Sequence, residues 1–126
     1  MKRAFQMTLI LLSFIPLYFA ASGIIGGASL ANDGMPVTNG IDNQLRYQSA
    51  YYLSLAFLIW WVIQDIHTRG TVLRLLILAI FLGGLARVYS YVSVGPPPAH
   101  AIGGMFLELG APLIVLWHRY IIRNIP

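Results

Sequence analysis

The chain has 126 residues, of which 58% are hydrophobic and only 10% are charged. A soluble domain usually carries roughly 25% charged residues, so this chain has too little polar surface to cover a water-soluble core. Its net charge of +4 comes from basic residues scattered at the ends of apolar runs, which excludes nucleic acid as an expected partner. The absence of cysteine excludes disulfides, thiolate metal sites and a cysteine nucleophile.

Four apolar runs make up most of the chain, and each is long enough to cross a membrane as a helix. We expect them at residues 4–31, 44–64, 71–94 and 101–122. Breaker residues separate them: Asp33-Gly34 and Pro36 lie in the first connection, and Gly95-Pro96-Pro97-Pro98 ends the third run. The sequence therefore predicts an all-α integral membrane four-helix bundle, with residues 1–126 in one transmembrane domain.

Two alternatives to this arrangement remain open. The first run has a passable cleavage site at Ser29-Leu30-Ala31 and resembles a secretory signal peptide. Its apolar part is longer than the 7–15 residues usual in such peptides, which favours a retained span. A soluble all-helical protein is the other alternative, and it is disfavoured because each run extends over roughly 30 Å of apolar helix.

The basic residues predict the orientation of the chain. Four spans place both termini and the link at residues 65–70 on one side. That side holds six basic residues and the other holds Arg46 and Arg87. Cytoplasmic segments are enriched in Lys and Arg, so we expect both termini in the cytoplasm and the protein in the inner membrane.

Two charged residues, Arg87 and Glu108, fall inside apolar runs. A charge in the middle of a membrane helix costs about 2.5–3.5 kcal/mol, so such residues usually face protein and find a partner. Both lie roughly 10 Å from the outer ends of neighbouring antiparallel spans. We therefore expect an Arg87–Glu108 ion pair, which either only holds the two helices together or takes part directly in binding or transport.

Other polar residues are expected at a similar depth. The start of the second run carries Arg46, with Asp42 or Asn43 as its helix cap. An arginine there suits an anionic head group or a carboxylate, because its guanidinium is a planar fork of donors. The hypothesis is a polar pocket open to the outer side and lined by Arg46, Tyr47, Tyr51, Arg87, Ser90, Tyr91, His100 and Glu108.

Small residues predict where the helices pack. Glycines let two backbones approach closely, and a proline inside a helix removes a backbone hydrogen bond and bends it. The residues expected to act in this way are Gly83, Gly84, Gly103, Gly104 and Pro112.

The stretch FLGGLAR, ending at Arg87 and followed by Ser90 and Gly95-Pro96-Pro97, resembles the central signature of a bacterial membrane family. Asp42–Tyr47 resembles an earlier element of that family, and Leu107-Glu108-Leu109 with Pro112 and Trp117 resembles its ending. On these residues the chain, from Asp42 onward, resembles the bacterial domain of unknown function family 4345. The resemblance implies no activity. It implies that Arg46, Arg87, Ser90 and Glu108 are the positions to test.

No catalytic or metal-binding motif is present in the sequence, and its three histidines are expected on two different sides of the membrane. We therefore expect no metal and no cofactor. The favoured function is an accessory or scaffold membrane subunit, or a homo-oligomer, with membrane lipids as partners. The alternative is binding or transport of a lipid or a small amphipathic anion, and a third possibility is an intramembrane isomerase that uses Glu108 as acid or base.

Overall fold

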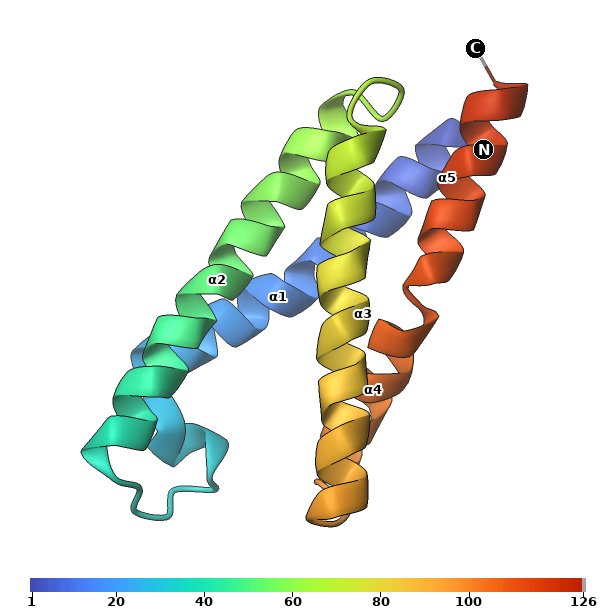
Figure 1. Ribbon diagram of the computed structural model, residues 1–126. Coiled ribbons are helices and arrows are strands. Elements are labelled where there is room, and N and C mark those ends of the chain that lie inside the picture. The colour runs from blue at the N-terminus through green and yellow to red at the C-terminus, as the bar shows by residue number, and fades with distance from the viewer. Residues whose placement is uncertain (126) are drawn as a thin grey trace. The chain divides into compact units, whose positions relative to one another are not determined.

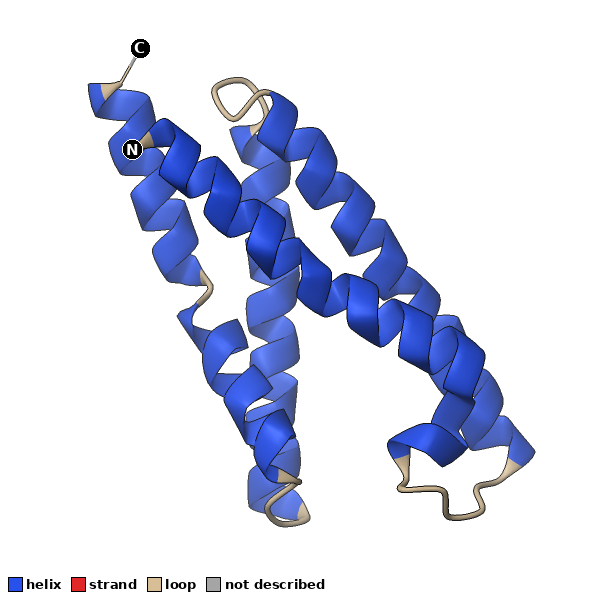
Figure 2. Cartoon of the chain, turned by 180° about the vertical axis from the view of Figure 1, so that it is seen from behind, coloured by secondary structure: helices blue, strands red, loops and turns tan. Residues whose placement is uncertain are grey.

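The computed structural model describes residues 1–125, and every regular element within that range is a helix (Figure 1). The predicted all-α fold is therefore confirmed. Turns and short loops join the helices, as Figure 2 shows. The helices are α1 (Lys2–Ala31), α2 (Asn39–Gln64), α3 (Gly70–Ser93), α4 (Ala99–Gly110) and α5 (Pro112–Asn124).

Three helical segments are long and apolar enough, by length and composition, to cross a membrane. They are α1, α3 and the stretch Ala99–Asn124 that contains α4 and α5. The part of α1 before its non-helical residue Gly27, residues 2–26, is about 38 Å long, which exceeds the roughly 30 Å of a bilayer's hydrocarbon core. The 26-residue α2 is not among the three, and its early turns carry Asp42 and Arg46. A fourth span at residues 44–64 therefore stays a prediction.

Helix α2 begins earlier than the sequence predicts, at Asn39 rather than at residue 44. Thr38 makes this possible, because its Oγ1 accepts a hydrogen bond from the N–H of Ile41 at 3.3 Å. The prediction that Asp42 or Asn43 caps this helix is wrong. Both residues lie inside α2, and the carboxylate of Asp42 bonds to a backbone group of α1 instead.

The chain divides into two compact units, which we describe separately. One unit is Arg3–Gln64 and contains α1 and α2. Gln6 Nε2 donates to the carbonyl of Ile63 at 2.8 Å, and Trp60 Nε1 donates to Ser13 Oγ at 2.7 Å. These bonds join the first half of α1 to the last turns of α2, so the two helices run antiparallel.

The other unit consists of Met1, Lys2 and the chain from Asp65 onward, with α3, α4 and α5. Helix α3 runs down to the proline-rich turn at residues 94–98, and α4 and α5 return along it (Figure 1). The Nε2 of His118 lies 2.6 Å from the carbonyl oxygen of Ile66, which ties α5 to the segment before α3. Ile66, Leu73 and Ile121 are fully buried.

The fourth apolar run is two helices rather than one, since α4 ends at Gly110 and α5 starts at Pro112. Pro112 has no N–H to bond to the carbonyl of Glu108, which instead accepts the N–H of Ala111 at 3.3 Å. The interruption lies at the proline where the sequence predicts a bend. Pro16, by contrast, sits within α1, and the non-helical backbone of that helix is found at Gly27.

Candidate functional site

A break in α1 is the first unusual feature of the α1–α2 unit. Gly27 has φ 70° and ψ −168°, which is far from helical geometry. In a continuous helix the N–H of Ala28 would donate to the carbonyl of Ile24. Here the N–H of Ala28 donates to Asp42 Oδ1 at 3.0 Å, and the carbonyl of Ile24 accepts from Arg46 Nη1 at 2.5 Å.

The two side chains that fill the break also pair with each other. Arg46 Nε donates to Asp42 Oδ2 at 2.8 Å, one helical turn apart on α2. We call Gly27, Asp42 and Arg46 the Gly27 clasp. The clasp satisfies both halves of an interrupted backbone hydrogen bond, which matters because Gly27 and Ala28 are buried and a buried backbone group without a partner is costly.

Glycine is required at the centre of the clasp for two reasons. A φ of +70° is readily adopted only by glycine. A Cβ at this position would also collide with the carboxylate of Asp42 and the guanidinium of Arg46. Sequence reasoning missed the break. Two signals for it were present in the sequence. One is the tandem Gly26-Gly27 late in an apolar run, and the other is the acid Asp42 four residues before the base Arg46, just after the loop.

The clasp also changes the chemistry of its carboxylate. The hydrogen bond from Arg46, followed by that from the N–H of Ala28, holds the pKa of Asp42 below its ordinary value of 3.8.

Arg46 was predicted to offer the planar fork of N–H donors of its guanidinium to an anion. In the structure its Nε and Nη1 are already used by Asp42 and the carbonyl of Ile24.

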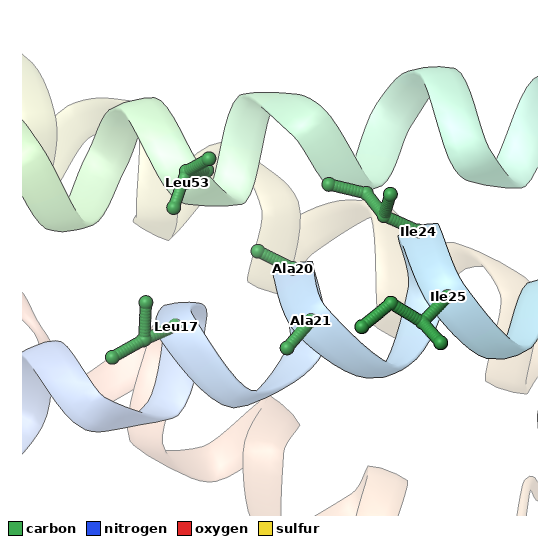
Figure 3. A pocket seen from close by; sticks show the side chains of 6 residues that line it. All are labelled: Leu17, Ala20, Ala21, Ile24, Ile25 and Leu53. Atoms are coloured by element: carbon green, nitrogen blue, oxygen red, sulfur yellow. The ribbon is translucent and has the colours of Figure 1, made fainter.

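An apolar hollow of about 220 Å³ lies beside the clasp on the α1–α2 unit (Figure 3). Ile24, whose carbonyl belongs to the break, is one of its walls. No polar atom is exposed in the lining, so the hollow offers nothing that would recognise a polar ligand. The residues that line it are Leu17, Ala20, Ala21, Ile24, Ile25 and Leu53.

In the other unit, Arg87 on α3 meets Glu108 on α4. Arg87 Nε lies 3.0 Å from Oε2 and 3.2 Å from Oε1 of Glu108. Gly84, one turn before Arg87, makes this possible: a Cβ there would lie only 3.0 Å from Glu108 Cβ and 3.2 Å from the backbone nitrogen of Leu109. Glu108 is also the residue whose carbonyl lacks its usual helical donor because of Pro112 and accepts the N–H of Ala111 instead.

The pair leaves most of the guanidinium unused. Only Nε of Arg87 bonds to Glu108, and within residues 1–125 neither Nη1 nor Nη2 forms a hydrogen bond. The side chain of Arg87 is 36% exposed and that of Glu108 is 22% exposed. In the part of the chain that the structure describes, the guanidinium of Arg87 is therefore only partly hydrogen-bonded.

The other residues of the hypothetical pocket fall into two groups. Tyr47 and Tyr51 belong to the α1–α2 unit, as Arg46 does, and their hydroxyl oxygens lie 2.7 Å apart on an exposed face of α2. Ser90, Tyr91 and His100 are exposed and belong to the other unit. A pocket shared by both groups stays a prediction.

The predicted packing glycines do not all make the same contact. Gly84 lies against α4, whereas a Cβ at Gly83, Gly103 or Gly104 would meet no atom of a neighbouring element within 4 Å in the described structure.

The structure also bears on metal binding: no three His, Asp or Glu side chains come together among residues 1–125.

Residues 4–118 match a protein family described as "Domain of unknown function (DUF4345)". The chain belongs to this family. Comparisons with curated proteins and with solved structures found no match. The DUF4345 match extends the resemblance seen from Asp42 onward back through most of α1. It therefore includes all three residues of the Gly27 clasp as well as Arg87 and Glu108.

Proposed function

We propose that this chain is a multi-pass inner-membrane protein that binds a lipid or a small amphipathic anion, with Arg87 as the anchoring donor. The proposal is carried by one observation: the guanidinium of Arg87 donates to Glu108 only through Nε, and its Nη1 and Nη2 form no hydrogen bond within residues 1–125. A guanidinium binds carboxylate or phosphate through two parallel N–H bonds, and Nη1 and Nη2 provide such a pair.

The membrane surroundings strengthen this argument. A polar N–H without a partner in hydrocarbon is costly, so an anionic head group near Arg87 relieves that cost. Leu107, next to Glu108 on α4, is exposed and suits the apolar tail of such a ligand. Since Glu108 already balances the charge of Arg87, we expect reversible binding rather than a permanently held ligand.

The proposed topology tells where the ligand enters. With four spans and both termini in the cytoplasm, Arg87 and Glu108 lie in the outer half of the membrane. The ligand then comes from the outer leaflet or from the space beyond it.

The test replaces Arg87 with lysine. Arg87→Lys keeps a cation for Glu108 but removes the planar fork, so we expect little change in melting temperature and about a tenfold weaker affinity for dodecanoate. Binding to the purified full-length chain in nanodiscs is measured by calorimetry. Arg3→Lys is the matched control and should bind as wild type does. Equal affinity in wild type and Arg87→Lys, or no binding by wild type, contradicts the proposal.

A separate observation favours a second candidate, a subunit that associates with other membrane helices. Gly83 and Gly103 are exposed, and a Cβ at either would meet open space. Small residues on an open helix face let another backbone approach. We expect a Gly103→Cys variant to form a cross-linked dimer in native membranes, whereas Leu113→Cys, also exposed on the same apolar run, serves as the control. Equal cross-linking of both variants, or none in Gly103→Cys, argues against this candidate.

A further inference from the structure

A second basic site lies at the opposite end of the α3–α5 unit from the proline-rich turn. A hollow of about 610 Å³ opens there between the start of α3 and the end of α5. Three arginines line it: Arg74 from α3, and Arg119 and Arg123 from α5. No acidic residue is part of the lining.

The local packing explains why the three arginines converge. His118 fixes α5 through its 2.6 Å contact with the carbonyl of Ile66, and its ring lies so close to Gly70 that a Cβ there would be 2.8 Å from it. Arg74 stands one turn after Gly70 on α3. Arg119 and Arg123 are four residues apart and share one face of α5.

Within residues 1–125, no acidic side chain forms an ion pair with these arginines. Arg74 Nη2 donates to Thr71 Oγ1 at 3.0 Å, a neutral partner. Arg119 and Arg123 are exposed, and neither forms an ion pair in the part of the chain that the structure describes. Tyr120 and Asn124 add polar atoms to the same lining. The hollow is thus a concentration of positive charge with room for a head group.

We propose that this hollow holds the phosphate head group of an anionic phospholipid. The hollow lies at the ends of two apolar segments that are long enough to cross a membrane, so lipid head groups are the anions at that level. Basic pockets between membrane helices attract anionic head groups, and guanidinium groups bind phosphate oxygens through paired N–H bonds. This inference depends on membrane insertion but not on the ligand proposed for Arg87.

The experiment uses the full-length chain in phosphatidylcholine nanodiscs, with and without phosphatidylglycerol, and counts retained lipids by native mass spectrometry. We expect wild type to retain phosphatidylglycerol in preference to phosphatidylcholine. The double variant Arg119→Gln/Arg123→Gln should lose this preference by about tenfold or more, since each arginine contributes to head-group attraction. If it does not fold, Arg123→Gln alone should show a smaller loss.

Two controls make the result specific. Lys2→Gln/Arg3→Gln removes two positive charges outside the hollow and should keep the wild-type preference. The double variant leaves Arg87 in place and should keep the wild-type affinity for dodecanoate, so that failure of this site and failure of the Arg87 proposal can be told apart.

A third arm adds inorganic phosphate to phosphatidylcholine nanodiscs, where we expect no rise in melting temperature. A rise without any lipid preference would show that free phosphate is the ligand and overturn the lipid assignment. Equal retention of the two lipids by wild type, or an unchanged preference in the double variant, would also overturn it.

Discussion

Gly27 shows how a single residue decides the local structure of a long apolar helix. Its positive φ interrupts α1 and exposes one backbone donor and one acceptor. Asp42 and Arg46 satisfy these two groups and each other. The ion pair and the glycine therefore depend on one another. The break at Gly27 makes room for the two side chains, and they in turn bond to the N–H of Ala28 and the carbonyl of Ile24 that the break leaves without helical partners.

Replacing Gly27 with alanine should destabilise the protein. The new Cβ would face a positive φ and would collide with both side chains of the clasp. We expect a loss of about 1–3 kcal/mol in the free energy of unfolding, measured as a lower melting temperature in detergent.

Gly40→Ala is the control for this prediction. Gly40 lies in the first turn of α2, where a Cβ would meet nothing within 4 Å, and its φ is not positive. We expect no loss of stability there, because alanine is the better helix former. If both variants melt at the same temperature, the clasp does not need its glycine.

The clasp also predicts how stability depends on pH. The pKa of Asp42 is lowered in the folded state, first by Arg46 and then by the N–H of Ala28. The stability from this carboxylate is therefore fully present above its ordinary pKa of 3.8 and is lost as the pH falls through the folded-state pKa.

Asp42→Asn should be less stable than wild type at neutral pH, and the difference should shrink as the medium is acidified below pH 3.8. Melting curves of the two proteins over an acid series measure this. Asp65, whose pKa is lowered mainly by its hydrogen bond with Thr68, contributes a fall of the same sign in both proteins. A constant difference between the two proteins at all pH values would contradict the prediction.

At the scale of helices, one glycine sets the distance between α3 and α4. The sequence has Gly83 and Gly84 next to each other, and both were expected to pack. Only Gly84 lies against α4, where Glu108 and Leu109 approach it. Adjacent residues point about 100° apart on a helix, and every face of α3 is rich in apolar residues, so periodicity did not distinguish the two glycines.

Gly84→Leu should push α4 away from α3 and separate Arg87 from Glu108. We expect a cost of about 1–3 kcal/mol, the usual range for overpacking, seen as a lower melting temperature. Gly83→Leu adds the same side chain one residue earlier, where a Cβ would meet open space, and should change stability little. A similar loss in both variants would show that the α3–α4 contact is not set by Gly84.

At the scale of the whole molecule, the number of spans decides where the two ends lie. Three segments are apolar enough to cross a membrane by length and composition, and α2 is not one of them. The six basic residues fall on one side only if α2 also crosses. We therefore predict that both termini are cytoplasmic and that the loop at residues 32–38 is outside.

Reporter fusions at the N-terminus, within residues 32–38 and at the C-terminus measure this directly. The expected pattern is cytoplasmic, external and cytoplasmic. A C-terminal reporter on the opposite side from the N-terminal one would indicate three spans, and it would place Arg87 and Glu108 at a different depth.

Composition and the spacing of apolar runs determined by themselves that the chain is helical, because runs of this length bury their backbone polar groups only as helices. They also indicated that Arg87 and Glu108 lie at equal depth on neighbouring helices. Tertiary structure alone decided which of two adjacent glycines packs, how much of the guanidinium is left unused, and that α1 breaks at Gly27. These features depend on groups far apart in the chain meeting at distances near 3 Å, and residue spacing along one helix does not contain that information.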